Sequence, residues 1–262
     1  ALVVGEYLNM EEKLSVKIVL VLIVLIGGMA FGLGAMWSKL QTLGQAPLRQ
    51  GSAGQAPQAQ PKVDIKTIKD LWGKNVIKFG DVNKKNLLVE VADPSCPYCH
   101  AAAGLNPELS GQMGPQFKLV ADGGTYVAPV IEMKKLVDSG KAAMVWLYTP
   151  GHGNGEMGTK ALYCANDIGK FWEAHDKLMT DKGYSLLNDT IKNDKTKSQE
   201  LVDFLGMGEI KDCLDSGKYD ARLGEDTQLA SSLGVSGTPG FFVNETNFAG
   251  AYNWNDMKSA LK

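Results

Sequence analysis

The chain has 262 residues, and its 27 Lys and Arg nearly balance its 29 Asp and Glu, for a formal net charge of −2. Proteins that bind nucleic acid neutralise phosphates with an excess of basic side chains, so this balance argues against nucleic acid as a partner. Residues 1–62 are predicted not to belong to the globular domain, because they contain an uncharged apolar run and a segment rich in Gln, Ala, Pro and Gly.

The N-terminal part of the chain predicts a membrane anchor. A tail at residues 1–16 precedes an anchor at residues 17–37, where residues 18–37 carry no charge and are long enough to cross a bilayer. A cleaved signal peptide is the competing interpretation, but its apolar region would be shorter, and no small-residue cleavage site follows Met36. A retained anchor is therefore favoured. Basic residues flank both ends, so charge leaves the orientation open.

A flexible linker is predicted at residues 38–62, which are rich in Gln, Ala, Pro and Gly and lack apolar periodicity. The remaining residues, 63–262, suit one compact domain that carries an insert at about residues 151–226.

Apolar patterning in this domain predicts strands and helices in alternation. Strands are expected at residues 76–79, 87–92, 142–148, 241–244 and 247–252. Helices are expected at residues 99–105, 130–137, 157–168, 171–180, 197–205, 209–216, 227–233 and 255–261. Residues 114–127 are Gly-rich and irregular. The order predicts an α/β fold with a helical insertion.

Cys96-Pro97-Tyr98-Cys99 lies between the strand at 87–92 and the helix that follows. The partial positive charge of a helix N-terminus favours the thiolate of Cys96, which is the species that attacks disulfides. Cys99, one turn inside, is expected to be buried and to resolve the mixed disulfide. Pro97 suits a first helical turn, where its nitrogen needs no hydrogen bond. The pattern predicts a redox-active pair.

A structural disulfide, half of a zinc site and a haem attachment are the alternatives for this pair. Zinc would need a second ligand pair, and Cys164 and Cys213 are 49 positions apart and form no second C-x-x-C. Cys96 to His100 matches C-x-x-C-H, but the strand before it and the Thr-Pro loop later in the chain argue against haem. No metal or cofactor is predicted.

Other motifs are weaker. Residues 153–158 match G-x-G-x-x-G, but no βαβ unit surrounds them, and they are interpreted as a flexible lead into the insert. His100 is expected either to tune the thiolate electrostatically or to be an exposed helix residue. His152 and His175 are expected to be structural.

Glu90 is a carboxylate within an apolar strand, six residues before Cys96. Alternation places it on the face of Leu88 and Ala92. Burial there is costly without a partner or a role. An edge position that reaches solvent is the alternative.

Three segments together resemble DsbA-like proteins of the thioredoxin superfamily. Residues 88–99 resemble their active-site strand and helix start, residues 234–244 their cis-proline loop and following strand, and residues 169–176 a helix of their inserted domain. The resemblance covers residues 63–262. It implies a thioredoxin-like fold interrupted by a helical domain, and thiol–disulfide exchange outside the cytoplasm.

The resemblance also implies roles for individual residues. Pro239 would be a cis-proline, although an ordinary turn is the alternative, and the backbone of Thr238 would bind an extended client segment, next to Pro97 and Tyr98. Glu90 would exchange a proton with Cys99.

Two further expectations concern the rest of the domain. In an oxidising compartment Cys164 and Cys213 would pair, with two buried free thiols as the alternative. The stretch at 104–127 is longer than the resemblance implies and is expected to shape the substrate groove.

These observations predict a membrane-anchored thiol–disulfide oxidoreductase whose domain lies on the extracytoplasmic side, periplasmic or at the cell surface. It would form disulfides in client proteins and be reoxidised by a membrane quinone-linked partner. An isomerase or reductase with the same site is one alternative. A tethered thioredoxin-like binding or chaperone module is another.

Overall fold

The structure is a computed structural model that describes residues 62–262. The predicted tail, the anchor and nearly all of the linker lie outside these residues and stay predictions. Within residues 62–262, no helix has both the length and the apolar character needed to cross a membrane.

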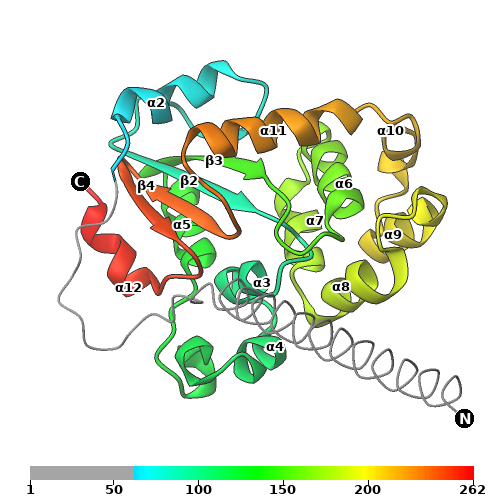
Figure 1. Ribbon diagram of the computed structural model, residues 1–262, viewed down its shortest axis with the longest axis horizontal. Coiled ribbons are helices and arrows are strands. Elements are labelled where there is room, and N and C mark those ends of the chain that lie inside the picture. The colour runs from blue at the N-terminus through cyan, green and yellow to red at the C-terminus, as the bar shows by residue number, and fades with distance from the viewer. Residues whose placement is uncertain (1–61) are drawn as a thin grey trace, which may run out of the picture. The chain divides into compact units, whose positions relative to one another are not determined.

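A five-stranded mixed sheet forms the centre of the domain (Figure 1). Its strands are β1 (Ile77–Phe79), β2 (Asn86–Ala92), β3 (Ala142–Tyr148), β4 (Gly240–Val243) and β5 (Thr246–Ala249). Their order is β1-β3-β2-β4-β5, with β2 and β3 parallel and the other pairs antiparallel. Because β2 and β3 are parallel, the loops that follow them leave the same edge of the sheet.

Helices cover both faces of the sheet, and residue alternation along β2 decides which residue meets which layer. Val89 and Val91 pack with α2 (Ile65–Asp70) and α11 (Asp220–Ser232), which run along one side of the sheet in Figure 1. Leu88, on the opposite face, packs with the second layer. That layer contains α3 (Pro97–Ala103), α5 (Pro129–Asp138) and α12 (Trp254–Met257).

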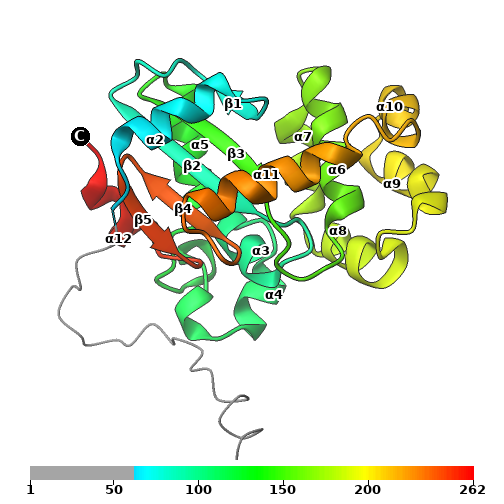
Figure 2. The ribbon, with the colours of Figure 1, turned by 45° about the horizontal axis from the view of Figure 1, so that its top comes forward.

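A group of helices between β3 and α11 extends from one end of the sheet (Figure 2). It consists of α6 (Glu156–Asp167), α7 (Phe171–Leu178), α8 (Asp181–Ser185), a π-helical segment at Leu186–Ile191, α9 (Ser198–Leu205) and α10 (Lys211–Asp215). Apolar residues of this group share one cluster with Ala92 and Trp146 of the sheet. The insert therefore packs against the sheet on the same side as α3.

The α/β fold with a helical insertion is confirmed, and all five predicted strands are present. The helix expected at 227–233 instead begins at Asp220, because its first turns place Leu223 and Asp226 in the interior. Three further helices escaped prediction, namely α2, α4 (Pro107–Gln112) and α8. Each is only five or six residues long, which is too short for a clear apolar period.

Candidate active site

Cys96 and Cys99 lie at the start of α3, directly after the loop that follows β2. Cys96 is the N-cap, with extended backbone angles (φ −80°, ψ 124°), and Pro97 opens the first turn. Both cysteines are free thiols, with Cys96 3% exposed and Cys99 fully buried. Gly104 ends the helix in the left-handed region with φ 71°. The helix thus begins two residues earlier than the 99–105 range that the sequence predicts.

The two thiols have opposite electrostatic environments. A hydrogen bond from Cys99 and, more weakly, backbone N–H groups of Tyr98 and Cys99 lower the pKa of Cys96 to about 7. Burial raises the pKa of Cys99 well above its ordinary value, and its hydrogen bond with Cys96 raises it further. Near neutral pH Cys96 is therefore the more readily deprotonated of the two thiols, and Cys99 keeps its proton.

The loop before β4 faces Cys96. The Thr238–Pro239 peptide is cis, and the Thr238 carbonyl oxygen lies 3.5 Å from Cys96 Sγ. Gly240 then pairs with Val91 of β2, so the sheet itself fixes this loop beside α3. The cis-proline loop and the start of α3 therefore meet at Cys96.

Asp93 fastens the loops of the site together, a role that the sequence did not reveal. Its fully buried carboxylate accepts hydrogen bonds from the backbone of Ser95, Gly151 and His152 and from the Ser95 hydroxyl, at 2.7–2.9 Å. A Cβ on Gly151 would lie 1.7 Å from Thr238 Oγ1, so only glycine permits this approach. The loop after β3 is therefore part of the site.

The glycines at 153–158 serve packing around the same loops. A Cβ on Gly155 would lie 1.8 Å from Asp93 Oδ1, and one on Gly158 would lie within about 3.1 Å of Leu187. Close approach of the insert to the active-site loop accounts for two glycines of the G-x-G-x-x-G match.

Glu90 lies in the interior, on the face of β2 that carries Leu88 and Ala92. It is fully buried, and neither carboxyl oxygen has a hydrogen-bond partner among residues 62–262. Burial raises the pKa of Glu90 to about 7, against a smaller opposing effect of His175. The alternative of an edge carboxylate is wrong, because β2 has β3 on one side and β4 on the other.

His100 joins α3 to the insert. Its Nε2 lies 2.9 Å from the Pro94 carbonyl oxygen, and its Nδ1 lies 3.0 Å from the Met179 carbonyl oxygen. The alternative of an exposed position is wrong, since His100 is fully buried. Burial lowers the pKa of His100 to about 4, so the ring is neutral at pH 7 and carries no charge with which to stabilise the thiolate.

The stretch at 104–127 borders the active site through stacked aromatic rings. Tyr98, 45% exposed, meets Phe117 edge to face at 5.7 Å, and Phe117 meets the buried Tyr126 at 5.6 Å. The Tyr126 hydroxyl donates to the Ala251 carbonyl oxygen at 3.3 Å. This contact gives Tyr98 a fixed ring at the surface beside Cys96.

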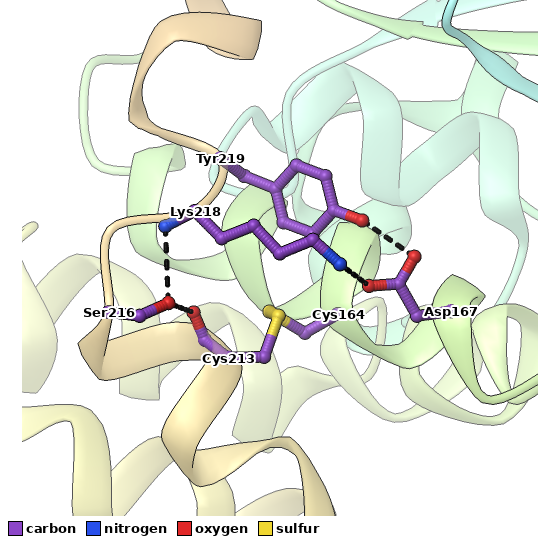
Figure 3. Close-up of a disulfide and its surroundings, with 6 residues drawn as sticks. All are labelled: Cys164, Asp167, Cys213, Ser216, Lys218 and Tyr219. Carbon is purple, nitrogen blue, oxygen red and sulfur yellow. Dashed lines mark hydrogen bonds and ion pairs between the residues drawn. A yellow bond between two sulfur atoms is a disulfide. The ribbon is translucent and has the colours of Figure 1, made fainter.

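Cys164 of α6 and Cys213 of α10 form a disulfide rather than two free thiols (Figure 3). Their Cα atoms are 5.9 Å apart. Nearby, Asp167 accepts hydrogen bonds from Lys218 at 2.7 Å and from Tyr219 at 2.6 Å, which fastens the lead into α11 onto α6. The disulfide thus belongs to the framework of the insert and lies on other helices than the Cys96–Cys99 pair.

A family model described as thioredoxin matches residues 130–262, which include β3, the insert, the cis-proline loop and the last two strands. The chain belongs to the thioredoxin family. The match begins after Cys96 and Cys99, so the position of this pair in the thioredoxin fold comes from the structure.

Solved structures share this thioredoxin-like fold. Oxidised BdbD from Bacillus subtilis aligns with a TM-score of 0.51 and 16% identity, over 78% of this chain and 96% of BdbD. Alpha-DsbA1 from Wolbachia pipientis aligns with a TM-score of 0.52 and 18% identity, over 71% of this chain and 88% of its own.

One curated relative is the Na(+)/H(+) antiporter NhaA 3 of Salinispora tropica, which is 28% identical over 177 residues. The alignment covers 66% of this chain and 22% of the antiporter. The chain therefore spans about a fifth of the length of the curated relatives that it matches.

Proposed function

We propose that this thioredoxin-family chain is a thiol–disulfide oxidoreductase that exchanges disulfides with client proteins through Cys96 and Cys99. A client thiolate attacks Cys96 Sγ of the oxidised pair, Cys99 leaves as the thiolate and takes up a proton, and a second client thiolate then displaces Cys96. The client gains a disulfide, and the pair ends as two thiols.

The observation that carries this proposal is the opposed chemistry of two free thiols in one helical turn. Cys96, with a pKa of about 7, faces the Thr238 carbonyl that a client backbone would use, while Cys99 is buried and holds its proton. A structural disulfide would have no need of this asymmetry. Glu90, buried beneath α3 without a partner among residues 62–262, is the proposed proton donor and acceptor for Cys99.

The direction of exchange is proposed to be oxidation of clients in an extracytoplasmic compartment. The framework disulfide between Cys164 and Cys213 supports this, because such bonds persist where thiols are not kept reduced. We further propose that residues 17–37 anchor the domain on that side and that a membrane quinone-linked partner reoxidises it. Anchoring would raise the effective concentration of that partner.

Isomerase or reductase activity is a second candidate, favoured by one observation. A Cys96 pKa of about 7 is nearer to that of thioredoxin than to the value of about 3.5 in strongly oxidising DsbA. Equilibration of the full chain with glutathione distinguishes the two. A reduction potential well above that of thioredoxin supports oxidation, and one near about −270 mV supports the reductase.

Trapping of clients tests the exchange itself. In Cys99→Ser, no second thiol remains to resolve the mixed disulfide at Cys96, so clients should stay covalently attached until a reductant is added. Cys96→Ser is the matched control and should trap none. A binding or chaperone module with an incidental cysteine pair would instead keep its cellular role in Cys96→Ser.

A further inference from the structure

Three buried side chains between the sheet and α7 have polar atoms without partners among residues 62–262. These atoms are both carboxyl oxygens of Glu90, Trp146 Nε1 and His175 Nε2. Glu90 and Trp146 are paired neighbours on β2 and β3, and Phe171 of α7 contacts the rings of both Trp146 and His175. Buried polar groups almost always have partners, so a cluster of unpartnered ones indicates a function or ordered water.

His175 connects this interior cluster to the surface. Its Nδ1 lies 2.9 Å from Asp176 Oδ1, whose side chain is 49% exposed. Since a carboxylate only accepts hydrogen bonds, Nδ1 carries the proton of the neutral ring, and the inward Nε2 is left as a free base. The His175 side chain is 1% exposed.

A cavity of about 330 Å³ lies on the outer side of His175. Its charged lining residues come from α5 and α7 and are Lys134, Lys135, Asp138 and Asp176. Lys134 pairs with Asp138 at 2.6 Å and lies over the Trp172 ring, so the wall includes fixed polar groups. The carboxylates of Asp138 and Asp176 are therefore the proton acceptors on this side of His175.

On its inner side, His175 lies near the acid beneath the active-site helix. Ala92, on the Glu90 face of β2, belongs to the same cluster as Cys99, and Leu88 on that face belongs to the same cluster as Ala102. Glu90 lies between these two residues on the strand, on the face of the sheet that α3 covers. The influence of His175 on the pKa of Glu90 shows that the two groups interact electrostatically.

We propose that His175 carries protons between Glu90 and solvent during thiol–disulfide exchange, an inference that rests on the function proposed above. When Cys99 leaves as a thiolate, the Glu90 carboxyl gives it a proton and becomes a carboxylate. While the cysteine pair is a disulfide, the His175 ring carries its proton on Nε2. It gives that proton to Glu90, directly or through an ordered water, while Nδ1 takes up a proton from the Asp176 side, which leaves the ring with its proton on Nδ1. The sequence runs in reverse when Cys99 is deprotonated for reoxidation.

The other titratable groups near His175 set the conditions for this transfer. They are Glu90 on β2, His100 on α3, Lys134, Lys135 and Asp138 on α5, and Asp176 on α7. Both ring nitrogens of His100 face backbone carbonyl oxygens, one of which accepts from the single N–H of the neutral ring, so neither nitrogen is available to the relay. Among these groups, His175 alone combines contact with the surface acid Asp176 and an unpartnered nitrogen in the interior.

The test is single-turnover reduction of the Cys96–Cys99 disulfide by dithiothreitol in the full chain. Tryptophan fluorescence monitors the reaction at a series of pH values around neutrality. His175→Ala should slow the step in which Cys99 is protonated by about a hundredfold, the lower end of general acid–base effects. Added imidazole should restore the rate, because the cavity gives it access to the vacated position. The double variant Glu90→Gln, His175→Ala should be reduced no more slowly than Glu90→Gln alone, because His175 acts only through Glu90.

Phe171→Leu is the control for packing, because it alters the ring stacked on His175 at 5.7 Å without removing a base. It should keep a near wild-type rate and show no response to imidazole. A wild-type rate in His175→Ala overturns the relay. The relay is also overturned if Phe171→Leu slows reduction as much as His175→Ala does. It is overturned as well if His175→Ala slows the Glu90→Gln variant by the same factor as it slows wild type.

A second measurement keeps failure of the relay separate from failure of the proposed function. In the Cys99→Ser background, attack of Cys96 on a small disulfide should be equally fast with and without the His175→Ala substitution, because that step needs no proton from Glu90. An inert Cys96 would refute the oxidoreductase, whereas an active Cys96 with no His175 effect on reduction would refute the relay alone.

Discussion

The domain contains two pairs of cysteines, and their surroundings differ in nearly every respect that controls reactivity. Cys96 and Cys99 share one helical turn at a helix N-terminus, remain free thiols and face the Thr238 carbonyl. Cys164 and Cys213 are 49 positions apart on two helices and form a disulfide. Cys96, Cys99 and Cys164 are buried and Cys213 is partly buried, so burial alone does not distinguish the two pairs.

Hydrogen bonding and charge make the difference. The first pair has donors that stabilise one thiolate and an acid, Glu90, in the same interior. The second pair packs with apolar side chains of the insert, and the charged groups near it, Asp167 and Lys218, pair with each other. The proposed function therefore assigns redox activity to the pair whose surroundings can hold charge and protons, and a structural role to the pair that closes a loop in the insert. Four variants test this difference and the surroundings of Cys96.

Cys96→Ser should have the largest effect. Without the attacking sulfur no mixed disulfide forms, so disulfide exchange with a model thiol peptide should fall to the rate of the uncatalysed reaction, while the thermal transition stays within a few degrees of wild type. The measurement pairs a peptide oxidation assay with a melting curve. Disulfide exchange that persists in this variant would contradict the proposal that Cys96 is the attacking thiol.

Replacement of both Cys164 and Cys213 by Ser should do the opposite. Removal of a disulfide that closes a loop of 49 residues should cost about 4 kcal/mol of the free energy of unfolding in the chain-entropy model. Exchange at low temperature should persist. Denaturant unfolding measures the first effect and the peptide assay the second, and loss of exchange in the folded variant would contradict a purely structural pair.

Glu90→Gln should change stability in a pH-dependent manner. The pKa of Glu90 is raised from 4.5 to about 7, so the protonated acid favours folding, and this contribution is lost as pH rises through about 7. At alkaline pH the variant should be more stable than wild type by on the order of 3 kcal/mol, with little difference near about pH 4. Equal denaturation midpoints of the variant and wild type at every pH would show that folding does not raise the pKa of Glu90.

Tyr98→Ala should have the smallest effect on stability, about 1 kcal/mol, because it removes one partly exposed edge-to-face contact with Phe117. Its effect should appear in a higher KM for a peptide client and an unchanged reactivity of Cys96 toward a small disulfide. Phe117→Leu is the comparison, since it removes the ring that holds Tyr98. If both variants leave KM unchanged, residues 104–127 do not shape the client surface.

Features that depend on nearby residues could be predicted from the sequence. Strand β2 is an apolar run bounded by polar residues, and the two cysteines follow it with Pro97 at the first helical position, so local pattern sufficed for both. Pro239 is different. Only the resemblance to DsbA-like proteins suggested its cis peptide, because spacing alone favours trans.

Features that depend on distant residues could not be predicted. The local sequence predicts only that Asp93 ends a strand. In the fold its carboxylate accepts hydrogen bonds from the backbone N–H groups of Gly151 and His152. Local pattern leaves His100 free to face solvent, whereas in the fold the carbonyl of Met179, 79 positions away, lies against it. The glycines at 153–158 are compatible with close packing, but the sequence does not show that Gly155 lies against Asp93 or Gly158 against Leu187.

The most direct test of the account is pH-dependent alkylation of the reduced, folded full chain by iodoacetamide, with each site identified by peptide mass. Below its pKa a thiol is protonated and unreactive, so labelling of Cys96 should rise with pH to half its maximum at about 7, while Cys99 and the two disulfide-bonded cysteines stay unlabelled. A midpoint near 9, or labelling of Cys99 before Cys96, would contradict the assignment of Cys96 as the attacking thiol.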